Sequence, residues 1–206
     1  MYVTQLQVSL QNNAEIQNLL QIIGLKIGTK YDDKKGLRYG HLMVMADQDH
    51  DGSHIKGLII NFIHKFWPSL IKMNNFVKEF ATPIIKAKKG GNVLTFFTQQ
   101  QYEKWKEDQG DRIKRWDIKY YKGLGTSDNE EAKEYFSDLK KHTLTFKYEG
   151  DDDDKHIELA FAKDKADARK DWLNTYDENT YVDHSKDFVT YTDFVNRELI
   201  GFSRYN

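Results

Sequence analysis

Three carboxylates stand at alternate positions in the segment Asp47-Gln48-Asp49-His50-Asp51-Gly52. Carboxylate oxygens are hard ligands, and several of them in one tight turn are typical of a site for a divalent cation. Close carboxylates also repel one another, so such a turn contributes little to stability by itself. The spacing therefore predicts a metal site, with a merely acidic surface turn as the alternative.

The loop of a calcium-binding helix–loop–helix also opens with Asp-x-Asp-x-Asp-Gly, so a site of that kind must be distinguished from a Mg²⁺ site at the end of a strand. That motif needs a bidentate Glu at loop position 12 and a helix in front of the loop. Counting from Asp47, position 12 is Leu58, and residues 41–46 do not have a helical pattern. The sequence therefore favours a Mg²⁺ site, in which one or two protein carboxylates leave room for water and phosphate oxygens.

The elements on either side of this turn suit such a site. His41 to Ala46 is a short, nearly all-apolar run, which predicts a strand covered on both faces in a parallel sheet. Ser53 to Trp67 predicts an apolar helix that ends near Pro68, so strand, turn and helix form half of a βαβ unit. Ligands bind at the carboxyl ends of parallel strands, and a helix N-terminus adds N–H donors for anions.

The rest of the chain divides into shorter elements. Four consecutive aspartates, Asp151 to Asp154, are predicted to form a solvated surface loop. The hydrophobic patterns and turn residues predict the following further elements: a helix over 12–24 that begins at Asn12 or Asn13 and stops at Gly24, a hairpin of 83–88 and 93–98, a helix over 99–107, a strand over 116–121, a helix from Ser127 or Asp128 to about 139, and helices over 163–176 and 191–202.

Composition excludes several classes of protein. With 206 residues, 39% of them hydrophobic, the chain can form a core as one domain or as one domain with an appended piece. Thirty-one Lys and Arg against 32 Asp and Glu exclude a uniformly basic surface, although local basic patches are possible. The absence of cysteine excludes disulfides, zinc–thiolate sites and thiol nucleophiles. No apolar run is long enough to span a membrane and no secretory signal is present, so we expect a soluble intracellular chain without a membrane partner.

The motifs together resemble a known family. The stretch from Leu37 through the acidic turn to Phe62 resembles the Toprim domain of eukaryotic-type type II DNA topoisomerases. The resemblance continues, over nearly the whole chain, through 75–80, 119–127, 132–136, 159–161, 167–173 and 194–200. It implies an α/β fold with a Toprim-like (Rossmann-like) parallel sheet flanked by helices, together with a small hairpin. It further implies a partial Toprim domain over residues 1–145 and a mainly helical connector over residues 146–206.

The resemblance also implies a function, namely the Mg²⁺-binding part of the DNA cleavage and religation gate of an ATP-dependent type II topoisomerase. Asp47 and Asp49 would be the metal ligands and Asp51 would support them, with Mn²⁺ or Ca²⁺ as substitutes for Mg²⁺. The implied DNA contacts are Lys122, Gly123, Gly125, Arg169 and Lys170. An ordinary loop lysine at 122 and a solvated helix face at 169 and 170 stay open as alternatives.

Parts that the family needs are missing from this sequence. Its Glu-Gly-Asp motif, whose Glu completes the metal site, does not occur here. The tyrosine nucleophile and the ATP-binding domain belong to other parts of such an enzyme, so no catalytic residue is assigned here and the isolated chain is expected to be inactive. ATP is then a cofactor of the parent enzyme only. We also expect an unpaired sheet edge, with self-association or local rearrangement near residues 1–12.

The implied partners are double-stranded DNA, a second copy of the parent enzyme in a homodimer, and the remaining topoisomerase domains, with the nucleus as location. Two other functions remain as alternatives. One is another Toprim enzyme, such as a primase or nuclease. The other is a non-catalytic module derived from a Toprim domain that binds nucleic acid or protein. The local basic residues that could contact phosphates in such a module are Arg112, Lys114, Arg115, Lys119 and Lys122.

Overall fold

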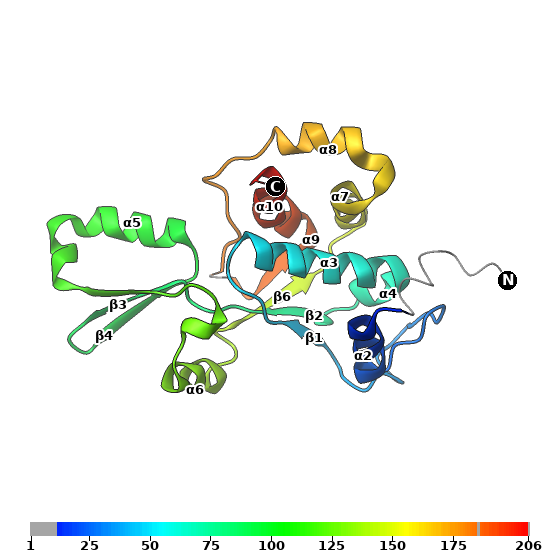
Figure 1. The fold of residues 1–206 in the computed structure, drawn as a ribbon, viewed down its shortest axis with the longest axis horizontal. Coiled ribbons are helices and arrows are strands. Elements are labelled where there is room, and N and C mark those ends of the chain that lie inside the picture. Colours follow the sequence, from blue (N-terminus) through cyan, green and yellow to red (C-terminus); the bar gives the residue numbers. More distant parts are fainter. Residues whose placement is uncertain (1–11, 185, 206) are drawn as a thin grey trace.

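A four-stranded sheet lies at the centre of the molecule, and a smaller three-stranded sheet forms a lobe at one side (Figure 1). The computed structural model describes residues 12–184 and 186–205. The central sheet has the order β1-β2-β6-β7, in which β1 and β2 are parallel, β2 and β6 are antiparallel, and β6 and β7 are parallel. Its strands are β1 (Leu42–Val44), β2 (Val77–Phe80), β6 (Thr143–Lys147) and β7 (Phe188–Thr190). The predicted α/β fold class is confirmed, and the sheet includes one antiparallel pair.

Helices flank this sheet. In Figure 1, α3 crosses the centre of the molecule, α7, α8 and α10 lie above it, and α2 and α6 lie below the sheet. The helices outside the lobe are α2 (Ala14–Ile23), α3 (His50–Phe66), α4 (Pro68–Ile71), α6 (Asn129–Ser137), α7 (Asp151–Phe161), α8 (Ala166–Leu173), α9 (Tyr191–Phe194) and α10 (Ile200–Tyr205). Short 3-10 helices cover Leu124–Thr126 and Lys163–Lys165, and a π-helix, Val195–Leu199, joins α9 to α10.

The predicted half of a βαβ unit is confirmed, because β1 is followed by α3, and the chain then passes through α4 to β2, which pairs with β1 in parallel. The helix α3 begins at His50, however, and not at Ser53 as predicted. Asp49 is its N-cap, so Asp51 and Gly52 belong to its first turn. The helix ends at Phe66, one residue before Trp67 and two before Pro68, which opens α4.

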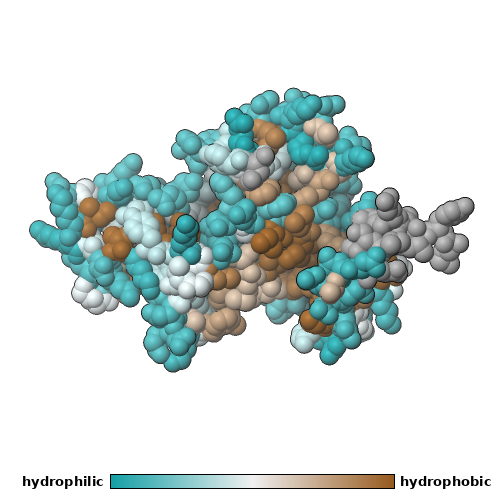
Figure 2. All heavy atoms as spheres, in the orientation of Figure 1, coloured by the Kyte–Doolittle hydropathy of each residue, from teal (hydrophilic) through white to brown (hydrophobic). Residues whose placement is uncertain are grey.

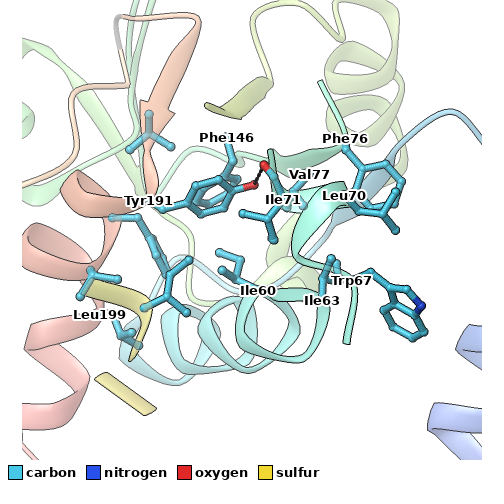
Figure 3. Packing of buried hydrophobic residues seen from close by; sticks show 14 of the residues in the cluster. Ile60, Ile63, Trp67, Leu70, Ile71, Phe76, Val77, Phe146, Tyr191 and Leu199 are labelled. Atoms are coloured by element: carbon cyan, nitrogen blue, oxygen red, sulfur yellow. Dashed lines mark hydrogen bonds between the residues drawn. The ribbon is translucent and has the colours of Figure 1, made fainter. Parts of the chain in front are cut away.

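The main core joins α3 to the sheet. Ile60 and Ile63 of α3 pack in one buried cluster with Phe146 of β6 and with Tyr191 of α9 (Figure 3). The Tyr191 hydroxyl donates a hydrogen bond to the carbonyl oxygen of Ile71 at 3.5 Å. Each large apolar side chain buried in this way contributes about 1.5–3 kcal/mol, so α3 and the turn that precedes it are held on a rigid support.

The side lobe has its own small core. It contains the antiparallel strands β3 (Ile85–Lys89), β4 (Asn92–Phe96) and β5 (Asp117–Tyr120), the helix α5 (Gln99–Gln109) and the 3-10 helix Gly110–Arg115, with the strand order β4-β3-β5. Ile85, Ala87, Phe96 and Tyr102 are its buried apolar residues. The predicted hairpin, α5 and β5 are confirmed, and β5 leads the chain from the lobe back toward the central sheet.

The four consecutive aspartates contradict the prediction of a solvated loop. They form the first turn of α7, and Asp153 is only 2% exposed. Its carboxylate accepts hydrogen bonds from the backbone N–H of Glu149 and from the N–H and hydroxyl of Thr192. Carboxylates are favourable at a helix N-terminus because they face the positive end of the helix dipole, which explains why this acidic run is helical.

The sequence patterns did not predict β2, β6 or β7. The predicted boundary between residues 145 and 146 falls inside β6, and β7 belongs to the segment predicted as a helical connector. The two-part division stays a prediction. Among the described residues β1 is an edge strand of the central sheet. The rearrangement predicted near residues 1–12 falls almost entirely on residues outside those described.

Two predicted helices differ in detail. The helix expected over 163–176 is confined to α8 and the short 3-10 turn before it, whereas the helix expected over 191–202 runs from α9 through the π-helix into α10. None of the helices formed by the described residues is long and apolar enough to cross a membrane.

Candidate metal and DNA site

The acidic turn leaves the carboxyl end of β1 and enters α3. The carboxylate Oδ1 of Asp49 accepts a hydrogen bond from the backbone N–H of Gly52 at 2.8 Å, which makes Asp49 the N-cap of the helix. Such a cap satisfies a helix N–H that would otherwise lack a partner. The same residue was predicted as a metal ligand, and the cap occupies only one of its two carboxylate oxygens.

Gly52 is required by the shape of this turn. A Cβ atom on this residue would lie 1.9 Å from the backbone carbonyl oxygen of Asp47. No side chain fits in that space, so the glycine that ends the acidic hexapeptide allows the chain to fold tightly into α3. The backbone thereby brings Asp47 beside the first turn of the helix.

Asp47 also contacts a second segment that was predicted to belong to the site. Its Oδ1 accepts a hydrogen bond from the backbone N–H of Leu124 at 2.7 Å. Gly123 has φ +81°, and a Cβ there would lie 2.8 Å from Asp47 Oδ2. The loop 122–125 therefore contacts the acidic turn through Gly123 and Leu124, although the two segments are far apart in sequence. Lys122, which precedes Gly123, is exposed.

A buried carboxylate holds the base of that loop. Lys119 donates to both Glu131 oxygens at 2.8 and 2.9 Å, the Tyr121 hydroxyl donates to Glu131 Oε1, and the backbone N–H of Asp128 donates to Oε2 at 3.0 Å. Burial raises the pKa of Glu131, but these donors outweigh it and lower that pKa to about 2. Burial and the bond to Glu131 together raise the pKa of Tyr121. Glu131 thus ties the end of β5 to the start of α6, on either side of the loop.

A second network, centred on the buried Lys56, lies behind the acidic turn, and no sequence pattern predicted it. The Lys56 ammonium on α3 forms ion pairs with Glu79 of β2 at 2.6 Å and with Glu198 of the π-helix at 2.5 Å. Burial alone would lower the pKa of Lys56, but the two carboxylates raise it. Burial likewise opposes ionisation of Glu79, and the charge of Lys56 is the largest of the effects that lower its pKa. One sequence signal could have revealed this network: Lys56 lies on the apolar face of α3, in line with Ile60 and Ile63.

Two of the predicted residues lie near the turn without a defined contact. Asp51 is exposed in the first turn of α3, where its charge is favourable to the helix dipole. Gly125 is exposed and has open space around the position of a Cβ. Their predicted roles, in metal support and DNA contact, stay predictions.

Arg169 and Lys170 lie on α8, away from the contact between Asp47 and the loop. Arg169 Nη1 donates to the carbonyl oxygens of Leu159, Ala160 and Ala162, so it caps the C-terminus of α7. Lys170 is exposed and pairs with Asp167 of its own helix at 2.8 Å. Both basic residues line a hollow of about 490 Å³ that also includes His54 of α3. Their role in DNA binding stays a prediction.

The basic stretch considered for a binding module is largely engaged in local contacts. Arg112 donates to the carbonyl oxygens of Asp108 and Gln109, Lys114 pairs with Asp111, and Lys119 is held by Glu131. Lys122 is the member of this stretch that directly precedes Gly123 and Leu124, the residues that contact Asp47.

The carboxylates of the turn fit part of a Mg²⁺ site. Within residues 12–184 and 186–205 no group of three or more His, Cys, Asp or Glu side chains is placed to hold a metal ion. Mg²⁺ nevertheless binds through one or two carboxylates, with water and phosphate oxygens as its other ligands. The hydrogen bonds described above engage Oδ1 of Asp47 and Oδ1 of Asp49. The second carboxylate oxygen of each residue is therefore the atom that would coordinate a metal ion.

Comparison with known proteins then identifies the family. A family model described as the C-terminal associated domain of TOPRIM matches residues 80–206. The chain is 55% identical over 194 residues to DNA topoisomerase 2 of Arabidopsis thaliana, and 46% identical over 209 residues to DNA topoisomerase 2-alpha of Mus musculus. The chain belongs to the type II DNA topoisomerase family.

A solved structure of a type II topoisomerase supports the same conclusion. The crystal structure of the Plasmodium falciparum topoisomerase II DNA-binding, cleavage and re-ligation domain matches with a TM-score of 0.91 at 52% identity, and covers 98% of this chain and 27% of that one. The chain covers only part of its topoisomerase relatives. The alignments include 93% of this chain and 13% of the Arabidopsis protein, and 94% of this chain and 14% of the mouse protein.

Proposed function

We propose that this chain is the part of a type II DNA topoisomerase that holds Mg²⁺ at the gate where DNA is cleaved and religated. The observation that carries the proposal is the contact between Asp47 and the loop Lys122–Gly125. Asp47 has a carboxylate of the kind that binds a cation, and the loop that contacts it begins with Lys122, an exposed residue of the kind that binds a phosphate. Phosphodiester chemistry commonly uses a metal ion close to a group that binds the phosphate.

Each residue would have a separate task at this gate. Asp47 and Asp49 would hold the ion, Asp51 would add negative charge, and Lys122 would bind a DNA phosphate. Gly123 and Gly125 would allow the loop backbone to approach the duplex. The bound ion would supply positive charge that stabilises an oxygen leaving phosphorus. Arg169 and Lys170 would form a second, more distant contact with DNA.

The activity of the whole enzyme is also a proposal, because the chain covers a small part of its relatives. We propose that the complete enzyme makes a transient double-strand break, passes a second duplex through it with ATP, and works as a homodimer on double-stranded DNA. We further propose a nuclear location. A Caenorhabditis elegans relative that is 51% identical is named a putative mitochondrial DNA topoisomerase 2, so localisation in cells is the direct test.

A titration with Mn²⁺ as a substitute for Mg²⁺ tests the metal site. We expect the 206-residue chain to bind Mn²⁺ and the Asp47→Asn/Asp49→Asn variant to lose that binding. The matched control is Asp151→Asn/Asp152→Asn, which removes two exposed carboxylates from the first turn of another helix, α7. Equal Mn²⁺ affinity of the wild type and the Asp47/Asp49 variant, or no Mn²⁺ binding by the wild type, would refute the proposal for this chain.

A further inference from the structure

Lys56 occupies an unusual place for a charged residue. Its side chain is 1% exposed, and it lies on the face of α3 that packs into the core with Ile60 and Ile63. Its ammonium is within 2.6 Å of Glu79 and 2.5 Å of Glu198, so α3, β2 and the π-helix meet at this one atom. An apolar cluster of the same volume would be about as stable as a buried ion pair. The stability of the core therefore does not by itself explain why Lys56 and its carboxylate partners occupy this position.

Both carboxylates of this network connect to the acidic turn. Gln48, which stands between Asp47 and Asp49, donates from Nε2 to Glu79 Oε1 at 3.0 Å. The Ser53 hydroxyl lies 2.6 Å from Glu198 Oε1 and 2.9 Å from the carbonyl oxygen of Asp49. One hydroxyl proton can serve only one of these acceptors at a time, so Ser53 links Glu198 to the backbone of the turn. The network thus contacts the turn at both of its ends.

Local backbone geometry places Glu198 in this network. Val195–Leu199 is a π-helical segment between α9 and α10. Such segments interrupt the regular sequence of helical side-chain directions and occur often at functional sites. Glu198 lies in this segment and reaches Ser53 and Lys56 on α3, from a position 145 residues after Ser53. The irregular helix therefore supplies, at Glu198, a partly exposed carboxylate that pairs with the buried Lys56; the Glu198 side chain is 19% exposed.

The charges do not cancel. One ammonium faces two carboxylates, of which Glu79 is 1% and Glu198 is 19% exposed, so the three groups together carry one negative charge in excess close to a turn that would bind a cation. Glu79 Oε2 is buried and has no hydrogen-bond partner in the structure. An unpaired buried carboxylate oxygen is costly, and a nearby divalent cation would offset part of that cost through space. The network is thus electrostatically suited to support a cation at the turn.

We propose that Lys56, Glu79 and Glu198 are positioning residues for the metal turn: through Gln48 and Ser53 they fix where the carboxylates of Asp47 and Asp49 point. The metal-related part of this inference rests on the function proposed above. The effect on the geometry of the turn can be measured without any metal, so the two proposals can fail separately.

Glu198→Gln in the 206-residue chain is the main test, since it keeps the shape of the side chain and removes its charge. The matched control is Glu158→Gln, an exposed glutamate on α7. The first measurement is amide hydrogen exchange without metal at Gly52 and Leu124, whose N–H groups donate to Asp49 and Asp47. We expect exchange about tenfold faster at both amides, the effect of losing one net hydrogen bond, and no change in the control.

The second measurement is Mn²⁺ affinity. Loss of a residue that orients metal ligands typically weakens metal binding by about 10–100-fold, and we expect a loss in this range for Glu198→Gln and none for Glu158→Gln. A purely structural role would lower the unfolding midpoint without changing exchange at Gly52 and Leu124 relative to the rest of α3. That outcome would overturn the inference.

A second variant covers the case in which Glu198→Gln fails to fold. Gln48→Leu removes the donor to Glu79 at a half-buried position, and we expect the same local increase in exchange at Gly52 and Leu124. Unchanged exchange at these amides in Gln48→Leu would refute the inference. If the wild type binds no Mn²⁺, the proposed metal site fails while the exchange result still decides whether the network positions the turn.

Discussion

Replacement of Gly123 by alanine should separate two demands that the loop makes on this residue. The first demand is the backbone conformation, because φ is +81° and ψ is 168°, a region that is essentially restricted to glycine and strains a residue with a Cβ by about 1–3 kcal/mol. The second demand is space, because the new Cβ would lie 2.8 Å from Oδ2 of Asp47. The Asp47 carboxylate would have to rotate away and would lose its hydrogen bond from Leu124.

The size of the effect follows from these two terms. A hydrogen bond to a charged group contributes about 1.5–3 kcal/mol, so with the conformational strain we expect Gly123→Ala to lower the free energy of unfolding by about 2.5–6 kcal/mol. Gly28 is the matched control, since its φ is +80° and nothing lies within 4 Å of the added Cβ. Gly28→Ala should lose only the conformational contribution of about 1–3 kcal/mol.

Urea unfolding and Mn²⁺ titration of the two variants provide the assay. Gly123→Ala should bind Mn²⁺ at least about tenfold more weakly, as expected when the orientation of a metal ligand is disturbed, whereas Gly28→Ala should bind it like the wild type. Gly125→Ala, with open space and no left-handed φ, should change the free energy of unfolding by less than about 0.5 kcal/mol. Equal losses in Gly123→Ala and Gly28→Ala, with equal Mn²⁺ affinity, would refute the argument that the loop orients Asp47.

Two further predictions concern the surroundings of the site. The pKa of Glu131 is lowered from 4.5 to about 2 in the folded chain, so its ionised form stabilises the fold above pH 4.5, and this contribution is lost as pH falls toward 2. In urea unfolding at several pH values, the free energy of unfolding of Glu131→Gln should therefore fall less steeply with acid than that of the wild type. An unchanged pH profile would contradict this prediction. Arg169→Ala should lower the free energy of unfolding by about 1.5–3 kcal/mol because it caps α7, while Lys170→Ala should change it by less than about 0.5 kcal/mol. If Lys170 contacts a DNA phosphate, its removal reduces the slope of log affinity against log salt by about 1, and an unchanged slope assigns it to a solvated helix face.

The acidic turn and the elements around it could be predicted because local rules determine them. A short apolar run, an acidic hexapeptide and an apolar helix follow one another within residues 41–67, and each has its own pattern. The error in the start of α3 has a physical reason: Asp51 and Gly52 are residue types that also favour turns, whereas here Asp49 caps a helix that already includes them. Asp151 to Asp154 were misassigned for the same reason, since helix starts also accept aspartate.

The rest of the site depends on contacts between distant segments, which sequence periodicity does not describe. β6 and β7 are short strands whose partners lie far away in sequence. The pairing of Lys56 with Glu198 requires a π-helix whose position no local pattern of apolar residues indicates. The contact of Asp47 with Leu124 likewise forms only after the lobe, with β3, β4 and β5, has brought the chain back to the central sheet.

The distance of 145 positions along the chain between Ser53 and Glu198 also bears on how the protein folds. A nascent chain that ends at residue 150 would contain the whole acidic turn, α3 and the loop Lys122–Gly125, but its Lys56 would face Glu79 alone. Contacts across so long a stretch form late, because the entropy of closing the loop is lost before the contact can stabilise the chain. The turn should therefore reach its final geometry only when α9 and the π-helix dock, so the support of the metal site would be among the last features to form during synthesis.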